Sequence, residues 1–202
     1  MNYVLKDELK RKGFHLLSLI YIFAYWFLEK KIVIYGLIAA ILIVALLEFI
    51  RFKIPIFNNF FKKHFKGFYR AEEADKISGL LGTLTGALAA ILIFDSIFDS
   101  KIMVFASFLY LAFGDSFAAI VGKTIGKHKL PTGKTIEGSA ACFAACLISG
   151  LFLFNFKFAF VGALIATIVE SIPWKINDNF WMQIVNAGLL TLLSQFMLWG
   201  RI

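Results

Sequence analysis

The chain has 202 residues, of which 60% are hydrophobic and 17% charged, with a mean hydropathy of +0.79 and a formal net charge of +8. Soluble globular domains contain roughly 45–50% apolar residues, and here the apolar residues form blocks long enough to cross a bilayer. Composition therefore indicates a multi-pass membrane protein and excludes a soluble domain. The positive charge needs no nucleic acid to explain it, because basic cytoplasmic loops face anionic lipid.

We expect one all-α domain over residues 1–202, a polytopic membrane helix bundle with about seven transmembrane helices. A span requires roughly 20 residues, so the first and sixth predicted helices are short. The predicted helices cover approximately 13–28, 32–50, 78–94, 102–121, 138–154, 157–172 and 180–199.

The distribution of basic residues predicts that the N-terminus is cytoplasmic. Most of the 21 lysines and arginines fall in segments 1–12, 51–77, 122–137 and 173–179, which alternate with the other connections. An excess of basic residues marks the cytoplasmic side. The loops 51–77, 122–137 and 173–179 would then form one cytoplasmic active-site face. The few basic residues on the opposite side are Lys30, Lys31, Lys101, Lys157 and Arg201.

The N-terminal segment, DELKRKGFHLL, places Glu8, Arg11, Lys12 and His15 on one face of a helix,. One interpretation is an interfacial helix whose cations meet lipid headgroups. The other makes Arg11 and Lys12 phosphate contacts at the membrane surface. His15 is either an acid or base, or a packing residue, and we favour packing.

Segment 54–70 interleaves phenylalanines with basic residues at helical spacing, which predicts a helix in the membrane interface,. The charged stretch that follows contains Glu73, which is either solvated or presented to the loop at 122–137. Ser78, Gly82 and Gly86 then recur at every fourth position, the pattern for close helix–helix approach in lipid,.

The stretch 114–139, GDSFAAIVGKTIGKHKLPTGKTIEGS, is the strongest candidate for chemistry. It places Asp115 inside an apolar run and follows it with glycines and lysines. Glycine lets a backbone approach a ligand closely, lysine supplies charge for phosphate, and a nearby carboxylate suits a phosphate-bound Mg²⁺ ion. The alternative is a loop that is basic only because cytoplasmic loops usually are.

The last cytoplasmic connection, VESIPWKINDNF, supplies further polar candidates. Glu170 lies near the end of a membrane helix, and a carboxylate at membrane depth suggests function. Asp178 and Asn179 follow a helix-breaking proline. Asn-Asp-Asn is also a good turn and N-cap sequence, so a purely structural role is the alternative.

Two Gly-Lys-Thr triplets, at 122–124 and 133–135, are not P-loops, because Phe117 and His128 stand where that motif requires its first glycine,. The order of the other motifs resembles the dolichol kinase, phytol kinase and CTP-dependent diacylglycerol kinase family of integral membrane proteins. The resemblance rests on residues 8–15, on residues 114–139, and on Glu170 with Asp178–Asn179.

The resemblance implies transfer of a phosphoryl group, typically from CTP, to the hydroxyl of a membrane-embedded lipid alcohol. We expect Asp115, assisted by Asp178 or Glu137, to bind Mg²⁺ on the nucleotide phosphates, and Asp178 or Asp115 to accept the alcohol proton. The expected phosphate contacts are Arg11, Lys12, Gly122, Lys123, Gly126, Lys134, Gly138 and Ser139. Further candidates are Glu8, His15, Glu73, Glu170 and Asn179.

Two other classes of function stay open. A cytidylyltransferase like the CDP-diacylglycerol synthases would release pyrophosphate, but the C-terminal Gly-His-Gly-Gly…Asp-Arg signature of those enzymes is absent. A transporter would place its charges near the bilayer midplane, whereas the carboxylates here cluster at one face. The acceptor could be a polyprenol or dolichol, phytol or geranylgeraniol, or diacylglycerol, and a homo-oligomer is compatible with the sequence. We expect the active site to face the cytoplasm from the plasma (inner) membrane.

Overall fold

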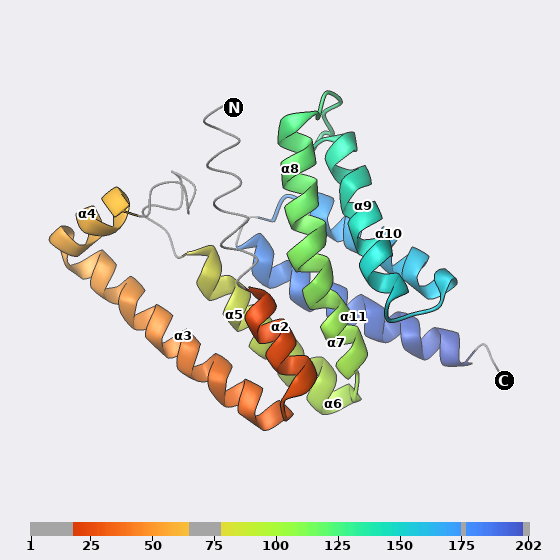
Figure 1. The fold of residues 1–202 in the computed structure, drawn as a ribbon, viewed down its shortest axis with the longest axis horizontal. Helices are drawn as coiled ribbons and strands as arrows, with labels where there is room; N and C mark the ends of the chain where they lie inside the picture. Colours follow the sequence, from red (N-terminus) through yellow and green to blue (C-terminus); the bar gives the residue numbers. More distant parts are fainter. Residues whose placement is uncertain (1–17, 65–77, 175–176, 200–202) are drawn as a thin grey trace.

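The computed structural model describes residues 18–64, 78–174 and 177–199 (Figure 1). The candidates Glu8, Arg11, Lys12, His15 and Glu73 lie outside these ranges. The described residues form helices joined by loops and turns, with one isolated β-bridge between Lys129 and Thr135. The prediction of an all-α fold is therefore confirmed for these residues.

Two long helices at the centre of the molecule are each built from several segments, with a π-helical stretch in the middle. They run from Gly79 to Phe98 and from Lys101 to Thr124. The elements, in chain order, are α2 (Ser18–Phe27), α3 (Lys30–Lys53), α4 (Pro55–His64), α5 (Gly79–Ala90), η2 (Ile91–Asp95), α6 (Ser96–Phe98), α7 (Lys101–Leu109), η3 (Tyr110–Asp115), α8 (Ser116–Thr124), α9 (Ile136–Leu151), α10 (Phe156–Ser171) and α11 (Asp178–Trp199).

Within the described residues, the predicted helix ranges coincide with helices, but several of their ends differ by a few residues. The helix predicted at 78–94 continues to Phe98, where Asp99 adopts a left-handed conformation (φ 51°) that ends it,. The helix predicted at 138–154 starts earlier, because the side chain of Thr135 caps it,. Helix α4 lies in the segment predicted to be an interfacial helix, so the predicted loop 51–77 is partly helical.

Three of the described helices are long and apolar enough to cross a membrane: Lys30–Lys53, Gly79–Phe98 and Lys101–Thr124. The apolar helices α2 and α9 are shorter. The 22-residue α11 is long, but it carries the buried polar residues Gln183, Asn186 and Thr191. Three candidate spans are therefore shown among the described residues, while seven spans and a cytoplasmic N-terminus stay predictions.

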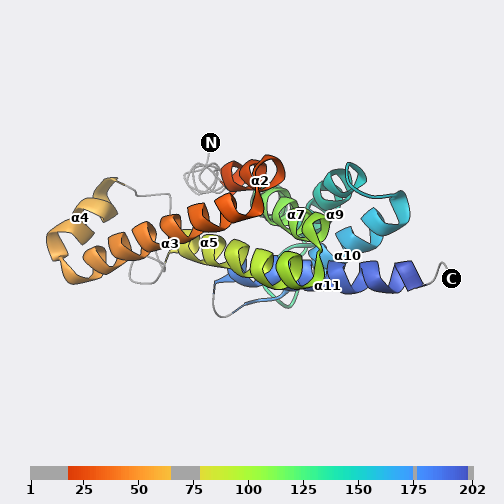
Figure 2. The ribbon, with the colours of Figure 1, turned by 90° about the horizontal axis from the view of Figure 1, so that it is seen from below.

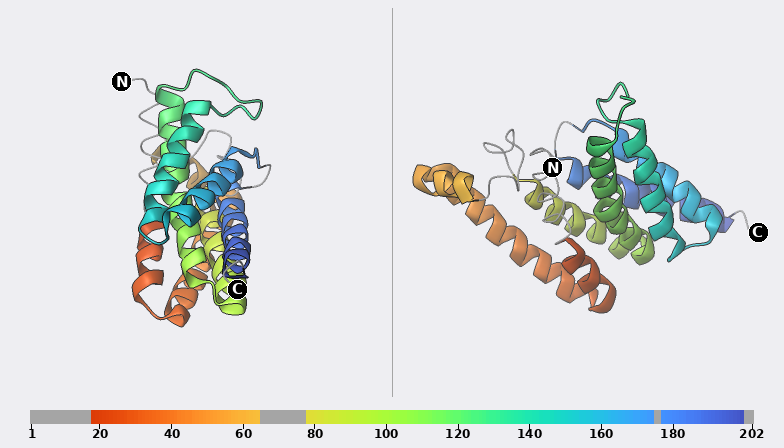
Figure 3. Two further views of the ribbon diagram at one scale, coloured as in Figure 1. Left: turned by 90° about the vertical axis from the view of Figure 1, so that its right-hand side faces the viewer. Right: turned by 45° about the horizontal axis from the view of Figure 1, so that its top comes forward.

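The helices pack as a bundle from which α3 diverges. Helix α9 lies against α8 and α10, and α11 lies against α5 and α7 (Figures 1 and 2). Helix α3 lies beside α5 and then extends away from the bundle (Figure 3). Only 11% of the most apolar 18-residue stretch of α3 is buried inside the protein. An apolar helix with this much exposed surface is suited to contact with lipid.

The connections between helices lie at two opposite ends of the bundle. The turn between α2 and α3 and the short α6 lie at one end, and the loop between α8 and α9 lies at the other (Figure 1). Asp95 holds the first end together: it accepts a hydrogen bond from Tyr25 Oη at 2.8 Å and lies 3.2 Å from Lys30 Nζ. The loop between α8 and α9, which carries several of the candidate residues, lies at the other end (Figure 1).

Candidate active site

The loop between α8 and α9 turns back on itself and directs Lys134 toward the bundle. The amide of Gly133 donates to the carbonyl of Leu130 (2.9 Å), and the amide of Leu130 donates to the carbonyl of Lys134 (2.8 Å). Gly133 has a φ of +83°, a conformation that suits glycine,. Pro131 presets the backbone angle at the second position of the turn,. The sequence LPTGK thus forms a hairpin-like turn that returns the chain to α9.

Thr135 and three glycines bring α8 and α9 close together at the base of this loop. Thr135 Oγ1 caps α9 by accepting a hydrogen bond from the amide of Gly138 (3.1 Å). A Cβ added at Gly122 would lie 2.8 Å from Thr135 Oγ1, and one at Gly138 would lie 2.8 Å from the carbonyl of Ala118. Gly126 is equally crowded by Gly122 and Thr135. These glycines therefore serve helix packing, and their predicted contact with phosphate stays a prediction.

Glu137 closes the same loop by binding His128. Its Oε1 lies 2.7 Å from His128 Nδ1, and both carboxylate oxygens lie 3.3 Å from the backbone nitrogen of His128. Hydrogen bonds from its own backbone amide and from the His128 side chain lower the pKa of Glu137 to about 2,. The carboxylate is therefore ionised at neutral pH and is engaged within the loop.

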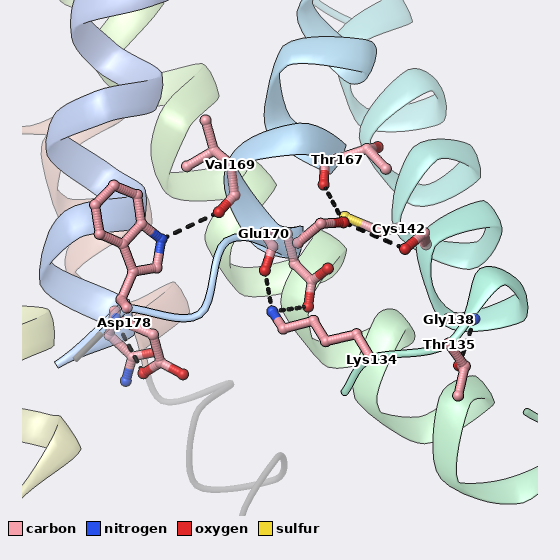
Figure 4. Close-up of polar contacts among 12 residues, drawn as sticks. Lys134, Thr135, Gly138, Cys142, Thr167, Val169, Glu170 and Asp178 are labelled. Atoms are coloured by element: carbon pink, nitrogen blue, oxygen red, sulfur yellow. Dashed lines mark hydrogen bonds and ion pairs between the residues drawn. The ribbon is translucent and has the colours of Figure 1, made fainter. Parts of the chain in front are cut away.

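Lys134 is bound to the C-terminal end of α10 (Figure 4). Its Nζ lies 2.5 Å from Glu170 Oε1 and also donates to the backbone carbonyl of Glu170. The side chain of Glu170 is only 6% exposed, whereas that of Lys134 is 33% exposed. Close by, Ser139 Oγ and Ser171 Oγ are 3.3 Å apart and link α9 to α10. The structure thus brings three predicted candidates, Lys134, Ser139 and Glu170, to one place.

Asp115 lies where a π-helical turn interrupts a long helix. It is the last residue of η3 and is half-buried. Gly114, next to it, packs so tightly against α9 that an added Cβ would lie 2.6 Å from Cys146 Sγ. π-helical turns within α-helices occur frequently at functional sites. Lys123, two turns further along α8, is exposed.

Asp178 begins α11 and is held near the start of α5 by its two neighbours. It is half-buried, and its Oδ1 accepts a hydrogen bond from the amide of Asn179 (3.0 Å). Asn177 Nδ2 donates to the carbonyl of Ser78 (3.3 Å), and Asn179 Nδ2 donates to the carbonyl of Gly79 (3.4 Å). The amides therefore fix the first turn of α11, which carries the candidate carboxylate.

The described residues contain no group of three or more His, Cys, Asp or Glu side chains placed to hold a metal ion. Protein sites for Mg²⁺ in phosphoryl transfer often provide only one or two carboxylates and take their remaining ligands from phosphates and water. Asp115 and Asp178 are half-buried carboxylates of this kind. Their donor chemistry fits a nucleotide-bound Mg²⁺ ion, and the ion stays a prediction.

Two features of this region were not found from the sequence. One is the pairing of Lys134 with Glu170, because 36 residues separate the partners and no local pattern links them. The other is Gln183, which donates to the carbonyl of Thr83 (2.9 Å) and accepts from Tyr21 Oη (3.1 Å). A glutamine inside an apolar helix was the available signal, because a polar side chain at membrane depth needs a partner.

Comparison with known proteins finds relatives that are named as kinases of diacylglycerol and phytol. The CTP-dependent diacylglycerol kinase 1 of Saccharomyces cerevisiae is 30% identical over 153 residues, 73% of this chain and 51% of the yeast protein. The probable chloroplastic phytol kinase 1 of Oryza sativa is 36% identical over 107 residues, 43% of this chain and 32% of the rice protein. No protein-family model matches the chain. No solved structure matches it either.

A third relative matches along nearly its full length. An uncharacterised protein of Methanocaldococcus jannaschii is 32% identical over 189 residues, 91% of this chain and 92% of the archaeal protein. By contrast, the chain spans about half the length of the yeast kinase and a third of the rice protein. These likenesses agree with the resemblance carried by the motifs. The chain belongs to the family of membrane lipid-alcohol kinases that includes the CTP-dependent diacylglycerol kinase and the phytol kinases.

Proposed function

We propose that this protein transfers the γ-phosphoryl group of CTP to the hydroxyl of a membrane lipid alcohol. The observation that carries the proposal is the meeting of Lys134, from the loop between α8 and α9, with Glu170 at the end of α10. Asp178, the first residue of α11, follows the end of α10 in the sequence after a short connection. Cationic and acidic side chains from separate connections are thus available at one end of a membrane bundle. CTP as the donor is taken from the name of the yeast relative.

Phosphoryl transfer requires in-line positioning and stabilisation of the charge on the phosphate oxygens. Asp115, assisted by Glu137 or Asp178, would hold Mg²⁺, which neutralises charge on the phosphates when it is bound. Lys123 and Lys134 would bind the phosphates from the loop side. Arg11 and Lys12, outside the described residues, are proposed to bind them from the opposite wall. These groups would align the γ-phosphate with an incoming alcohol.

The acceptor is proposed to be an alcohol that reaches the site from the membrane at headgroup depth. Diacylglycerol, phytol or geranylgeraniol, and polyprenols or dolichol all present such a hydroxyl. Asp178 or Asp115 would accept the proton of this hydroxyl as its oxygen attacks phosphorus. A carboxylate that binds the metal cannot also be the free base, so the two residues would divide these roles.

Purified protein in lipid nanodiscs tests the proposal, with each candidate alcohol supplied in turn and with CTP or ATP as the donor. We expect CTP- and Mg²⁺-dependent formation of a phosphorylated lipid. The variant Asp115→Asn should lose at least about 100-fold in activity, because a neutral amide holds Mg²⁺ weakly. Its unfolding temperature should stay close to that of the wild type, which shows that the variant is folded. Near wild-type turnover in Asp115→Asn would overturn the role given to this carboxylate.

A further inference from the structure

The contact between Lys134 and Glu170 is unusual because the acidic partner is buried and the basic partner is not. The side chain of Glu170 is 6% exposed and that of Lys134 is 33% exposed. Burying a carboxylate is costly unless it is paired. The C-terminal end of a helix also carries partial negative charge, which favours a nearby cation. Both effects hold the ammonium group of Lys134 at the end of α10.

The same geometry leaves part of the ammonium group available. An ammonium group has three N–H donors, and the structure uses Lys134 Nζ for Glu170 Oε1 and for the backbone carbonyl of Glu170. A third of the Lys134 side chain is exposed to solvent. Lys134 is therefore fixed in place by Glu170 and still has capacity to bind an anion.

We propose that Glu170 is a positioning residue that holds Lys134 where it can bridge the end of α10 and a phosphate group of the nucleotide. This inference rests on the proposed function and extends it to a residue that does not touch the substrate. A flexible lysine loses side-chain entropy when it binds phosphate, and a lysine already held in place loses less. Without Glu170, Lys134 would keep its charge but lose its orientation.

The test compares Glu170→Gln and Glu170→Asp with the wild-type protein in nanodiscs. We expect Glu170→Gln to raise KM for CTP about tenfold with a smaller change in kcat, because loss of a binding contact acts mainly on KM. Glu170→Asp should recover part of this loss. The exchange of both residues, Lys134→Glu with Glu170→Lys, should restore an ion pair and stability but not the KM for CTP.

A matched control separates positioning from simple stabilisation of α10. Trp174 Nε1 donates to the carbonyl of Val169 at the same end of this helix (3.1 Å). Trp174→Phe removes that bond while keeping an aromatic ring against Trp181. This variant should lose stability as Glu170→Gln does, yet keep the wild-type KM for CTP. An unchanged KM in Glu170→Gln, or restored KM in the exchanged pair, would overturn the inference.

A second measurement does not depend on turnover. An amine-reactive reagent labels exposed lysines, and mass spectrometry reports the extent at Lys134. We expect faster labelling in Glu170→Gln than in the wild type, and protection by CTP with Mg²⁺ that is strong in the wild type and weaker in Glu170→Gln at the same CTP concentration. If no lipid is phosphorylated, the proposed function fails, while protection of Lys134 by CTP would still support the inference. Absence of that protection in the wild type would overturn it.

Discussion

Glu137 shows how a single carboxylate can stabilise the loop that surrounds it. It lies in the first turn of α9, where the positive end of the helix favours an anion,. It also reaches back to the ring and the backbone of His128 at the other side of the loop. Its role within the loop is therefore clear from contacts, whereas the metal-binding role expected from the sequence stays a prediction.

The low pKa of Glu137 predicts how stability depends on pH. In the folded protein its pKa is lowered from 4.5 to about 2. The ionised form is thus favoured by folding, and its stabilising contribution is complete above pH 4.5 and is lost as the pH falls toward 2. Wild-type protein and Glu137→Gln should differ in unfolding temperature at pH 5, and this difference should shrink as the pH falls from 4.5 toward 2,. A difference at pH 2 as large as that at pH 5 would contradict this account.

At the scale of elements, the contact between α5 and α11 combines glycines on one helix with amides on the other. An added Cβ at Gly86 would lie 3.0 Å from the Cα of Phe180, and one at Gly79 would lie 3.2 Å from Asn179 Nδ2. The side chain of Asn177 lies directly over Gly82. The small residues recognised in the sequence therefore create the surface against which the start of α11 is held.

Substitution of Gly82 should disturb this contact. Gly82→Ala places a methyl group into the Asn177 side chain and should cost about 1–3 kcal/mol of stability, since overpacked sites must shift. Gly36→Ala is the matched control, because nothing lies within 4 Å of a Cβ at Gly36 in α3, and alanine favours a helix over glycine. Thermal unfolding should show a lower unfolding temperature for the first variant alone. Equal unfolding temperatures would refute the packing role of Gly82.

The apolar pattern of the sequence predicts where the helices lie, but not their internal distortions or the pairing of their polar side chains. Apolar blocks located the helices, because burial in lipid requires long apolar runs. They do not indicate the π-helical turns that end at Asp95 and Asp115. Glu170 was recognised as a carboxylate at membrane depth, but its partner Lys134 is set by the turn at Leu130–Gly133 and by tertiary contact. Single residues could be predicted, and their pairing could not.

At the scale of the whole molecule, the two ends of the bundle have different roles in this account. Asp95 is 3% exposed and joins the turn after α2 to the central helices through Tyr25 and Lys30. This cluster lies at the end opposite the loop between α8 and α9 (Figure 1). It is therefore expected to stabilise the fold without taking part in phosphate transfer.

Asp95→Asn should separate stability from activity. Loss of the charge weakens hydrogen bonds and the ion pair by about 2 kcal/mol in total, so the unfolding temperature should fall. The activity per folded molecule, measured well below that temperature, should stay within about twofold of the wild type, since a remote change of this kind leaves transition-state contacts intact. A large loss of kcat without loss of stability would contradict the division between the two ends.

The fate of doubly labelled CTP tests the central claim most directly. One label is placed in the γ-phosphate and another in the cytosine ring, and purified protein is supplied with lipid alcohols and Mg²⁺. The account predicts that the γ-phosphate label enters the lipid while the cytosine label remains in CDP. Cytosine label in the lipid with release of pyrophosphate would contradict the account and establish a cytidylyltransferase. Absence of both labels from every lipid would contradict enzymatic transfer to a lipid alcohol.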